Sequence, residues 1–405
     1  MSSGYLDVLR TAGALRVFVP ALIGRLSFAM VTLVLLFAVQ RSMDSFAIAG
    51  AAIGAFGLAN VIASPYRARF VDRRGQRFAL NSLAIAFAAG LSGIAALTAQ
   101  SGPPAGVLIG LAAVVGLFPP PLGASMRVLW GSITMPGTLR TKAYSVDAVC
   151  EELLFTTGPL IAAAIVGAAS PTIGLLATAL VAVVGTLGMT SSSLSRGRVA
   201  VAASPRKRSR PLRQKGFIPV LIALLGVGVV LGTVEVVAPA VADTHGSVGF
   251  AGILLASFAA GSAVGGLLYG LRSWRSSLVN RLIILGTVMT VLCALLTTIG
   301  SFAVLGFGLA AVGFFLAPSL VTGYLLADDL TAAEVRTEAS SWINTAVNAG
   351  AAVAAAIVGF AVDAVEPRLG FIIGAGMALT LVVAASVPLL RNSRPAAVTD
   401  PVQSE

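Results

Sequence analysis

The chain has 405 residues, of which 57% are apolar and only 11% are charged. Soluble domains carry about 25% charged residues, and here 27 Lys and Arg, 16 Asp and Glu and one His are too few to cover the surface of a water-soluble protein of this length. Together with a mean hydropathy of +0.95, this composition excludes a soluble globular protein and predicts a protein embedded in a lipid bilayer.

The residues that build disulfides and metal sites are scarce. Cys150 and Cys293 are the two cysteines, and both lie inside apolar stretches, which argues against a disulfide framework or a cysteine-based metal site. His245 is the single histidine, so a histidine cluster is excluded. No Gly-x-x-x-x-Gly-Lys-Ser/Thr motif for ATP occurs in the sequence. We therefore expect no metal ion, no cofactor and no enzymatic activity.

The hydropathy pattern predicts an all-α membrane protein. A helix needs about 20 apolar residues to cross the hydrocarbon. Arg10 and Arg16 precede the first apolar run, and no small-residue cleavage site follows it, so we expect a retained span rather than a signal peptide. Twelve spans are predicted, at 17–39, 46–64, 78–99, 105–129, 143–168, 172–192, 217–242, 248–270, 279–299, 302–326, 339–362 and 369–390.

The basic residues predict how these spans are oriented. With the N-terminus inside, the outer loops hold only Arg41 and Arg368. The inner side collects Arg10, Arg16, five arginines between 67 and 77, Arg140, Lys142, eight basic residues from 196 to 215, Arg272, Arg275, Arg281, Arg336, Arg391 and Arg394. By the positive-inside rule both termini are expected in the cytoplasm. This distribution explains the net charge of +11 without a nucleic-acid partner, and we expect a multi-pass protein of the plasma membrane.

Short segments recur about 195 residues apart. FVPALI at 18–23 recurs as FIPVLI at 217–222, and RTKA at 140–143 recurs as RTEA at 336–339. LAAVVGLFPPPL at 111–122 recurs as LAAVGFFLAPSL at 309–320, which aligns Pro120 with Pro318, and AAAIVG at 162–167 recurs at 354–359. The separation falls from 196 residues for RTKA to 192 for AAAIVG, so one helical turn is missing from the second copy along span 11. We therefore expect two pseudo-symmetric six-helix halves, 1–195 and 217–391, a basic cytoplasmic linker at 196–216, and a cytoplasmic tail at 392–405.

The turn between spans 2 and 3 reads ARFVDRRGQRFAL, from residue 68 to 80. It resembles the signature loop of the major facilitator superfamily, Gly-x-Leu-x-Asp-Arg-x-Gly-Arg-Arg/Lys with a leucine three residues on. The matching positions are Asp72, Arg73, Gly75, Arg77 and Leu80, and the departures are Ala68, Phe70 and Gln76. In the second inner loop of a chain with two six-helix halves the motif is specific, and the resemblance extends from residue 17 to 391.

This resemblance implies a transporter with a twelve-helix fold in which one half rocks against the other. It also implies a gating loop, in which Asp72 pairs with arginine and with the N-terminus of span 11 when the protein is outward-open. A helix N-terminus attracts a carboxylate, and Gly75 permits a tight turn with positive φ. The alternative is a solvated loop that only sets topology. The second-half copy keeps Gly266 and Arg272 but has Leu271 in place of the acid.

Gly158 and Pro159 in span 5 resemble the Gly-Pro of the antiporter signature in proton-coupled drug exporters of the superfamily. The match is partial, because alanines at 162–164 replace flanking glycines. It favours efflux over uptake. Proline kinks helices, so Pro159, the Pro119–Pro121 run with Pro120 at its centre, and Pro318 in span 10 are expected to bend their spans.

Few ionisable residues fall inside the predicted spans, and each is a functional candidate. Arg25 in span 1 and Glu151 and Glu152 in span 5 have similar predicted depths, with Asp147 one turn from Glu151 and Arg127 able to reach the same layer. We predict a buried cluster with one acid in excess. It is either a static ion-pair brace or a proton site in which Glu151 or Glu152 titrates and Arg25 binds an anionic group or competes for the carboxylate.

Two further groups extend the candidate site. Glu235 in span 7 has no cation nearby in sequence, so it is either a proton or substrate site or a hydrogen-bonded neutral acid near the outer mouth. Asn344 and Asn348 share one face of span 11 and either point into a cavity or hydrogen-bond between helices.

The sequence predicts a secondary active transporter that works by rocker-switch alternating access and exports a small organic molecule against protons. Its expected partners are the lipid bilayer, a small-molecule substrate and protons, and we expect it to act as a monomer. The alternatives are a uniporter or importer of sugars or related metabolites, and a non-transporting membrane sensor or assembly protein.

Overall fold

The computed structural model describes residues 5–100, 103–196, 210–244, 249–364 and 366–392, and no strand occurs within them. The helices are α1 (Tyr5–Arg10), α2 (Ala14–Met43), α3 (Phe46–Arg74), α4 (Gln76–Thr98), α5 (Ala105–Gly116), α6 (Leu122–Ile133), α7 (Thr138–Ala168), α8 (Pro171–Ser191), α9 (Ser193–Arg196), η1 (Pro211–Arg213), α10 (Phe217–Thr244), α11 (Gly249–Leu271), α12 (Leu278–Leu295), η2 (Leu296–Thr298), α13 (Phe302–Gly313), α14 (Leu316–Leu330), η3 (Ala333–Val335), α15 (Arg336–Ala364) and α16 (Leu369–Asn392).

These helices make the twelve crossings that the sequence predicts. Ten described stretches are long and apolar enough to cross a membrane. The 29-residue α3 and the α5–α6 pair complete the set. Helices suit lipid because they satisfy every backbone N–H and C=O internally. The protein is therefore an all-α, multi-pass membrane protein.

The fourth crossing of each half is divided into two helices. In the first half the chain leaves helix between Gly116 and Leu122, where three consecutive prolines supply no backbone N–H. In the second half the interruption lies between α13 and α14, and Pro318 falls in the first turn of α14. A missing N–H has little effect there, because the first N–H groups of a helix have no partner inside it. In the first half the predicted bend is thus a break, whereas in the second half Phe314 and Phe315, between the two helices, keep helical backbone angles.

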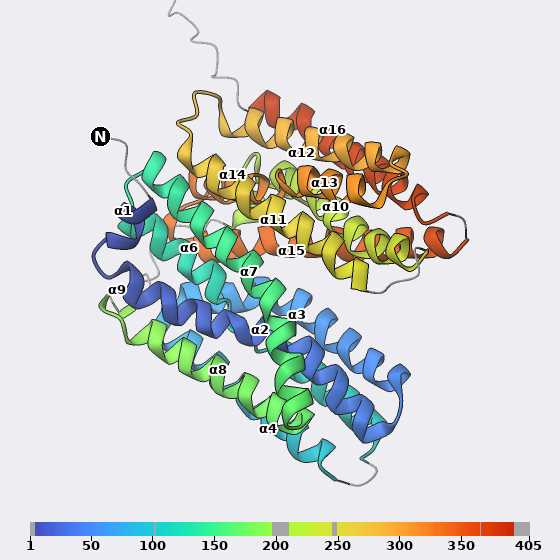
Figure 1. Cartoon of the computed structure of the whole chain (residues 1–405). Helices are drawn as coiled ribbons and strands as arrows, with labels where there is room; N and C mark the ends of the chain where they lie inside the picture. Colours follow the sequence, from blue (N-terminus) through green and yellow to red (C-terminus); the bar gives the residue numbers. More distant parts are fainter. Residues whose placement is uncertain (1–4, 101–102, 197–209, 245–248, 365, 393–405) are drawn as a thin grey trace, which may run out of the picture.

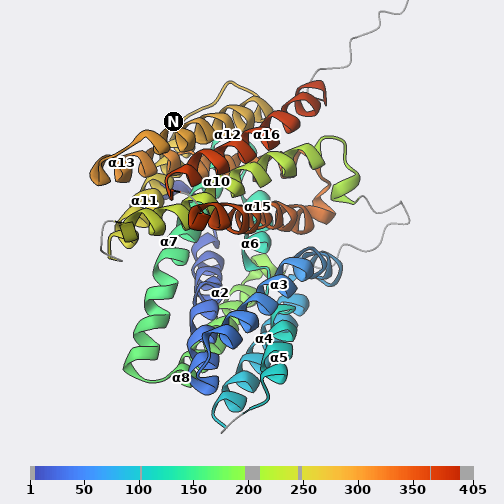
Figure 2. The ribbon, with the colours of Figure 1, turned by 90° about the vertical axis from the view of Figure 1, so that its right-hand side faces the viewer.

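The crossings are divided between two six-helix halves. Figure 1 shows α2–α8 on one side and α10–α16 on the other, and Figure 2 shows the same division after a quarter turn. The first and fifth crossings of each half pack together, α2 against α7 and α10 against α15. This pairing repeats in the second half, as the internal sequence repeat predicts.

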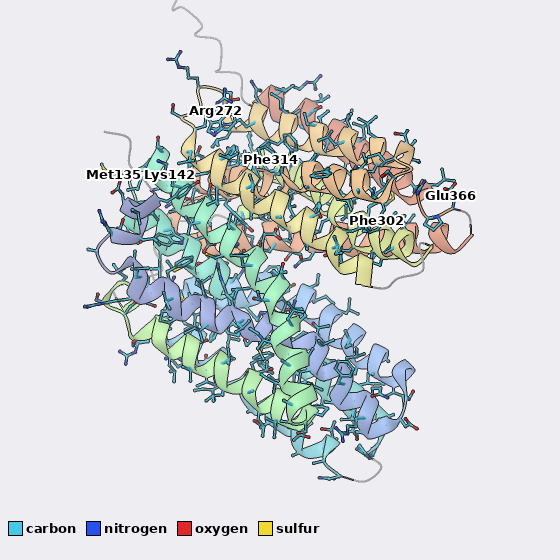
Figure 3. All side chains as sticks on the ribbon, viewed as in Figure 1. Met135, Lys142, Arg272, Phe302, Phe314 and Glu366 are labelled. Carbon is cyan, nitrogen blue, oxygen red and sulfur yellow. The ribbon has the colours of Figure 1, made fainter. Side chains whose placement is uncertain are left out.

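The molecule has two distinct ends. One end is formed by α1, the α3–α4 turn at Gly75, the α6–α7 turn and the α11–α12 turn, and we call this end the basic face. Figure 3 shows Met135, Lys142 and Arg272 at this end and Glu366, in the α15–α16 turn, at the opposite end. The positive-inside rule predicts that the basic face is cytoplasmic.

The apolar cores show where the halves meet. One core runs through both halves and includes Leu129 and Tyr144 of the first half with Leu224 and Ala317 of the second. A second core belongs to the first half alone and is built from the parts of α2–α5, α7 and α8 that lie away from the basic face. The halves are therefore packed together at the basic face.

Several predicted features lie largely outside the described residues. They are most of the basic linker at 196–216, the tail after 392, and His245.

Candidate functional site

A cavity of about 240 Å³ lies between the two halves. The first half contributes α2, α3, α7 and the 119–124 segment, and the second half contributes α10, α14 and α15. Its polar lining consists of Arg25, Ser27, Asn60, Ser64, Arg67, Glu151, Glu152, Glu235, Tyr324, Ser341, Asn344 and Asn348. A mostly apolar cleft with a few convergent polar groups is the usual form of a small-molecule site.

Four of the predicted charged residues form a continuous ion-pair network. Arg25 binds Asp147 with both terminal nitrogens, at 3.0 and 3.1 Å. Nε of Arg127 lies 3.2 Å from Asp147, and Nη2 of Arg127 donates to Glu151. Two arginines thus match two acids, in a layer where Asp147 has no exposed surface. Paired and hydrogen-bonded in this way, buried charges avoid the large penalty of an isolated ion.

Arg127 also connects the two halves. Its guanidinium carbon lies 3.8 Å from the centre of the Tyr324 ring of α14. The Tyr324 hydroxyl in turn donates to Oδ1 of Asn344 in α15. Asn344 therefore faces the cavity and also makes an interhelical hydrogen bond, while Asn348 lines the same wall one turn further along.

Glu152 is the acid left over from the network. Its carboxylate interacts electrostatically with Glu151 and with Glu235 of α10. Glu235 lines the cavity and is exposed to it, and among the described residues neither acid has an ion pair. Two carboxylates from opposite halves thus share the cavity without a cation between them.

Arg67 was expected in the inner loop, and the structure corrects this. Because α3 continues to Arg74, Arg67 stays in the helix and lines the cavity, with 8% of its surface exposed. Nη1 donates to the carbonyl of Gly116 at 2.9 Å, and Nη2 donates to the side chain of Asn60 at 2.8 Å. Its Nε is buried without a partner, and no ion pair to an acid is found for it among the described residues.

Gly158 and Pro159 lie where α7 meets α2. A Cβ at Gly158 would lie 2.5 Å from Cβ of Ala29, so only glycine permits this approach. Pro159 sits inside α7, which continues as one helix from Thr138 to Ala168. Gly158 and Pro159 therefore lie at the contact between two helices that line the cavity.

The signature loop contacts α15 at the basic face. Gly75 has φ 82°, the positive value expected for this turn. The Asp72 carboxylate accepts a hydrogen bond from the Glu338 N–H at 3.0 Å and has another from the Thr337 side chain. The predicted arginine partner of Asp72 is absent among the described ion pairs, because Arg69 instead binds Glu338 at 2.6 Å. Arg73 and Arg77 are exposed.

A second set of polar contacts closes the same face. Asp328 at the end of α14 accepts a hydrogen bond from the Tyr144 hydroxyl. Arg140 and Arg336, which the internal repeat makes equivalent, lie 3.8 and 3.6 Å from its carboxylate. Ser64 and Ser341 share a hydrogen bond of 2.7 Å between α3 and α15. Together with the contacts of Asp72, these contacts join the two halves on the side of the cavity that lies toward the basic face.

Sequence reasoning missed three of these residues for an identifiable reason. Tyr144 and Asp328 lie 184 positions apart, and a pairing at that separation leaves no local pattern. Gln76, a departure from the signature, is buried, donates to the Ser125 carbonyl and accepts from Ser195. Its role is to tie α4 to α6 and α9, which the motif alone does not predict.

No group of three or more His, Cys, Asp or Glu side chains suited to a metal ion occurs in the part of the chain that the structure describes.

Comparisons with known proteins agree with this architecture. Residues 220–404 match the sequence model of the Major Facilitator Superfamily. The human organic anion transporter MFSD10 (TETRAN) has a similar structure, with a TM-score of 0.70 and 16% identity, over 95% of this chain and 100% of that one. A bacterial homologue of the iron transporter ferroportin, in an outward-facing state, reaches 0.68 at 16% identity, over 94% and 99%. No curated protein sequence matches.

At these identities the solved structures establish the fold alone. They show that this chain has the twelve-helix fold of these two transporter structures, and the sequence of its second half also matches the Major Facilitator Superfamily model.

Proposed function

We propose that this protein is a secondary active transporter that exports a small organic molecule in exchange for protons by alternating access. The cavity between the halves is the substrate site. The contacts of Asp72, Asp328 and Ser64 close it toward the basic face. Breaking them while the opposite ends approach would expose the cavity to the other side of the membrane.

The observation that carries proton coupling is the placement of Glu152 and Glu235. They belong to opposite halves, face one cavity and repel each other electrostatically. A proton on either carboxylate removes that repulsion. Because rocking changes the separation between the halves, it changes the affinity of this pair for a proton. The two acids thereby link proton binding to conformation.

The ion-pair network has a different role in this scheme. Arg25, Arg127, Asp147 and Glu151 satisfy one another. We assign them the role of a brace that holds α2, α6 and α7 together, leaving Glu152 as the first-half acid free to exchange a proton. Arg127 also contacts the second half through the Tyr324 ring.

The direction of transport rests on Gly158 and Pro159, whose place at the α2–α7 contact matches the use of small residues for close helix approach. The cargoes named for the similar structures, an organic anion and iron, differ from each other. They therefore leave the substrate open. The basic face is taken as cytoplasmic, so that the open end of the cavity faces outward in this conformation.

The test has two stages. Thermal-shift screening of the purified protein against drugs, sugars and amino acids identifies a ligand. Substrate-driven proton movement is then measured in proteoliposomes that contain a pH-sensitive dye. Glu152→Gln and Glu235→Gln should fold but lose proton movement. Glu334→Gln, an exposed acid at the basic face, is the matched control and should behave as the wild type.

Three outcomes decide against parts of this proposal. Normal coupling in both variants and in Glu151→Gln would rule out the carboxylate mechanism. Transport that ignores an imposed pH gradient would indicate a uniporter or importer. A ligand that binds but never crosses the membrane would indicate a sensor built on the same fold.

A further inference from the structure

We propose that Arg67 is an anion-binding subsite of the cavity and that the substrate is amphoteric, with an oxyanion at Arg67 and a protonated amine at Glu152 and Glu235. This inference rests on the proposed transport function, since it names the chemistry of the molecule carried. It begins from a buried guanidinium that lines the cavity and has no carboxylate partner among the described residues.

The hydrogen bonds of Arg67 do not use all the N–H donors of its guanidinium group. A guanidinium has five N–H donors. Three of them serve the carbonyls of Gly116 and Asn60 and the Asn60 side chain, and Nε is buried with no acceptor. All three acceptors are neutral, so the positive charge itself is uncompensated. A planar guanidinium with free donors suits a carboxylate or another oxyanion.

The other charged groups of the cavity wall separate into two poles. Arg25 and Glu151 are neutralised by Asp147 and Arg127. The remaining charges are Arg67 on α3 and the pair Glu152 and Glu235 on α7 and α10. The wall therefore has one unmatched positive group and two unmatched acids, which an amphoteric molecule complements.

This polarity also explains exchange with protons. An amine cation placed beside Glu152 and Glu235 competes for the same carboxylates as a proton does, so loading the substrate releases protons. The oxyanion at Arg67 does not take part in that competition and provides binding that is independent of the acids. Arg67 also contacts the last carbonyl of α5, so a purely structural role must be distinguished by experiment.

The experiment compares three matched probes by thermal shift and by equilibrium binding to the purified, full-length protein. The probes are 4-(aminomethyl)benzoate, which carries both charges, 4-methylbenzoate, which lacks the amine, and 4-methylbenzylamine, which lacks the carboxylate. Wild-type protein should prefer the first over either analogue. In Arg67→Gln the preference over 4-methylbenzylamine should fall by about tenfold, the range expected for a charged hydrogen bond. Arg272→Gln, at an exposed arginine of the basic face, should change nothing.

Arg67→Lys covers the case in which the glutamine variant does not fold. Lysine retains the positive charge but lacks the planar guanidinium with its several N–H donors. This variant should therefore keep a reduced preference for the amphoteric probe. The proposal is overturned if wild-type protein does not distinguish the three probes, or if both Arg67 variants fold and keep the wild-type preference. Loss of proton movement in Glu152→Gln alongside an unchanged Arg67 variant would reject the subsite and leave the proposed function intact. The reverse pattern would retain the subsite and reject proton coupling.

Discussion

The contact between α2 and α7 in the first half and that between α10 and α15 in the second half are equivalent by the internal repeat, yet they are held by different interactions. In the first, Arg25 of α2 binds Asp147 of α7 in addition to the close approach of the helices at Gly158. In the second, Cβ atoms added at Gly228, Gly232 and Gly350 would lie 2.0–2.2 Å from carbonyl oxygens of the facing helix. Charges respond to protons and water, whereas close backbone packing does not. We therefore expect the α2–α7 contact to be sensitive to the loss of a charge and the α10–α15 contact to be sensitive to added side-chain volume.

The largest effect should come from breaking the charged contact. Asp147→Ala leaves Arg25 buried without its carboxylate, and removing one partner of a buried pair typically costs about 3–5 kcal/mol. We expect a loss of this size in the free energy of unfolding, measured by denaturant titration in detergent micelles. Glu334→Ala, at an exposed position, is the control. A loss below about 1 kcal/mol, the range of exposed pairs, would show that ions do not hold this contact.

A substitution at the glycines between α10 and α15 should lower the stability by less than Asp147→Ala does, but the loss should still be measurable. Gly232→Ala places a Cβ about 2.2 Å from the Ala351 carbonyl oxygen, and overpacking of this kind costs about 1–3 kcal/mol. Gly376→Ala in α16 has open space around its Cβ and should be neutral or slightly stabilising. Equal melting temperatures for the two variants would contradict the proposed packing of α10 on α15.

Closure of the basic face should depend on pH through Asp72, which α15 holds by the Glu338 N–H. Burial raises the pKa of Asp72 to about 7 in the closed form, above the usual aspartate value of about 3.9 expected once the face opens. The closed form therefore binds the proton more tightly, and its population should rise as pH falls from 8 toward 5. For one proton the change is at most about tenfold per pH unit.

This pH dependence can be followed by distances between spin labels at Met135→Cys and Ser276→Cys, one on each half at the basic face, with Cys150 and Cys293 replaced by serine. Asp72→Asn should remove the dependence. A dependence that persists in Asp72→Asn would assign it to another group.

The smallest effect is expected where the second half contributes a neutral hydrogen bond. Tyr324→Phe removes the donor to Asn344 but keeps the ring over Arg127. Hydrogen bonds between membrane helices average about 0.6 kcal/mol, so stability should fall by no more than about 1 kcal/mol, and proton movement should be unchanged. A loss as large as that of Asp147→Ala would remove the distinction between the two halves.

The sequence was sufficient for the fold because lipid imposes simple rules on length, charge and repeat. The twelve crossings and the two halves followed from apolar runs and recurring segments. The layer shared by Arg25 and Asp147 could be predicted from depth, since both helices start at the same face and rise equally per residue. Glu152 as the excess acid was one of two candidates, and only the contact between Arg127 and Glu151 separates them.

What could not be predicted depends on tertiary contacts. Arg67 looks like a loop arginine because four more arginines follow within ten residues, and its burial is decided by the free carbonyl that ends α5. Asp72 was expected to pair with an arginine, but the nearby Arg69 pairs with Glu338 instead. Both outcomes involve partners far away in sequence, where no local spacing applies.

The unequal cores have a consequence for how the protein is made. The core that belongs to the first half alone is complete once α8 has been synthesised. The other core includes Val8 near the start of the chain and Leu389 near its end. The first six crossings can therefore consolidate while translation continues, but the basic face reaches its final packing only after the last helix has entered the membrane.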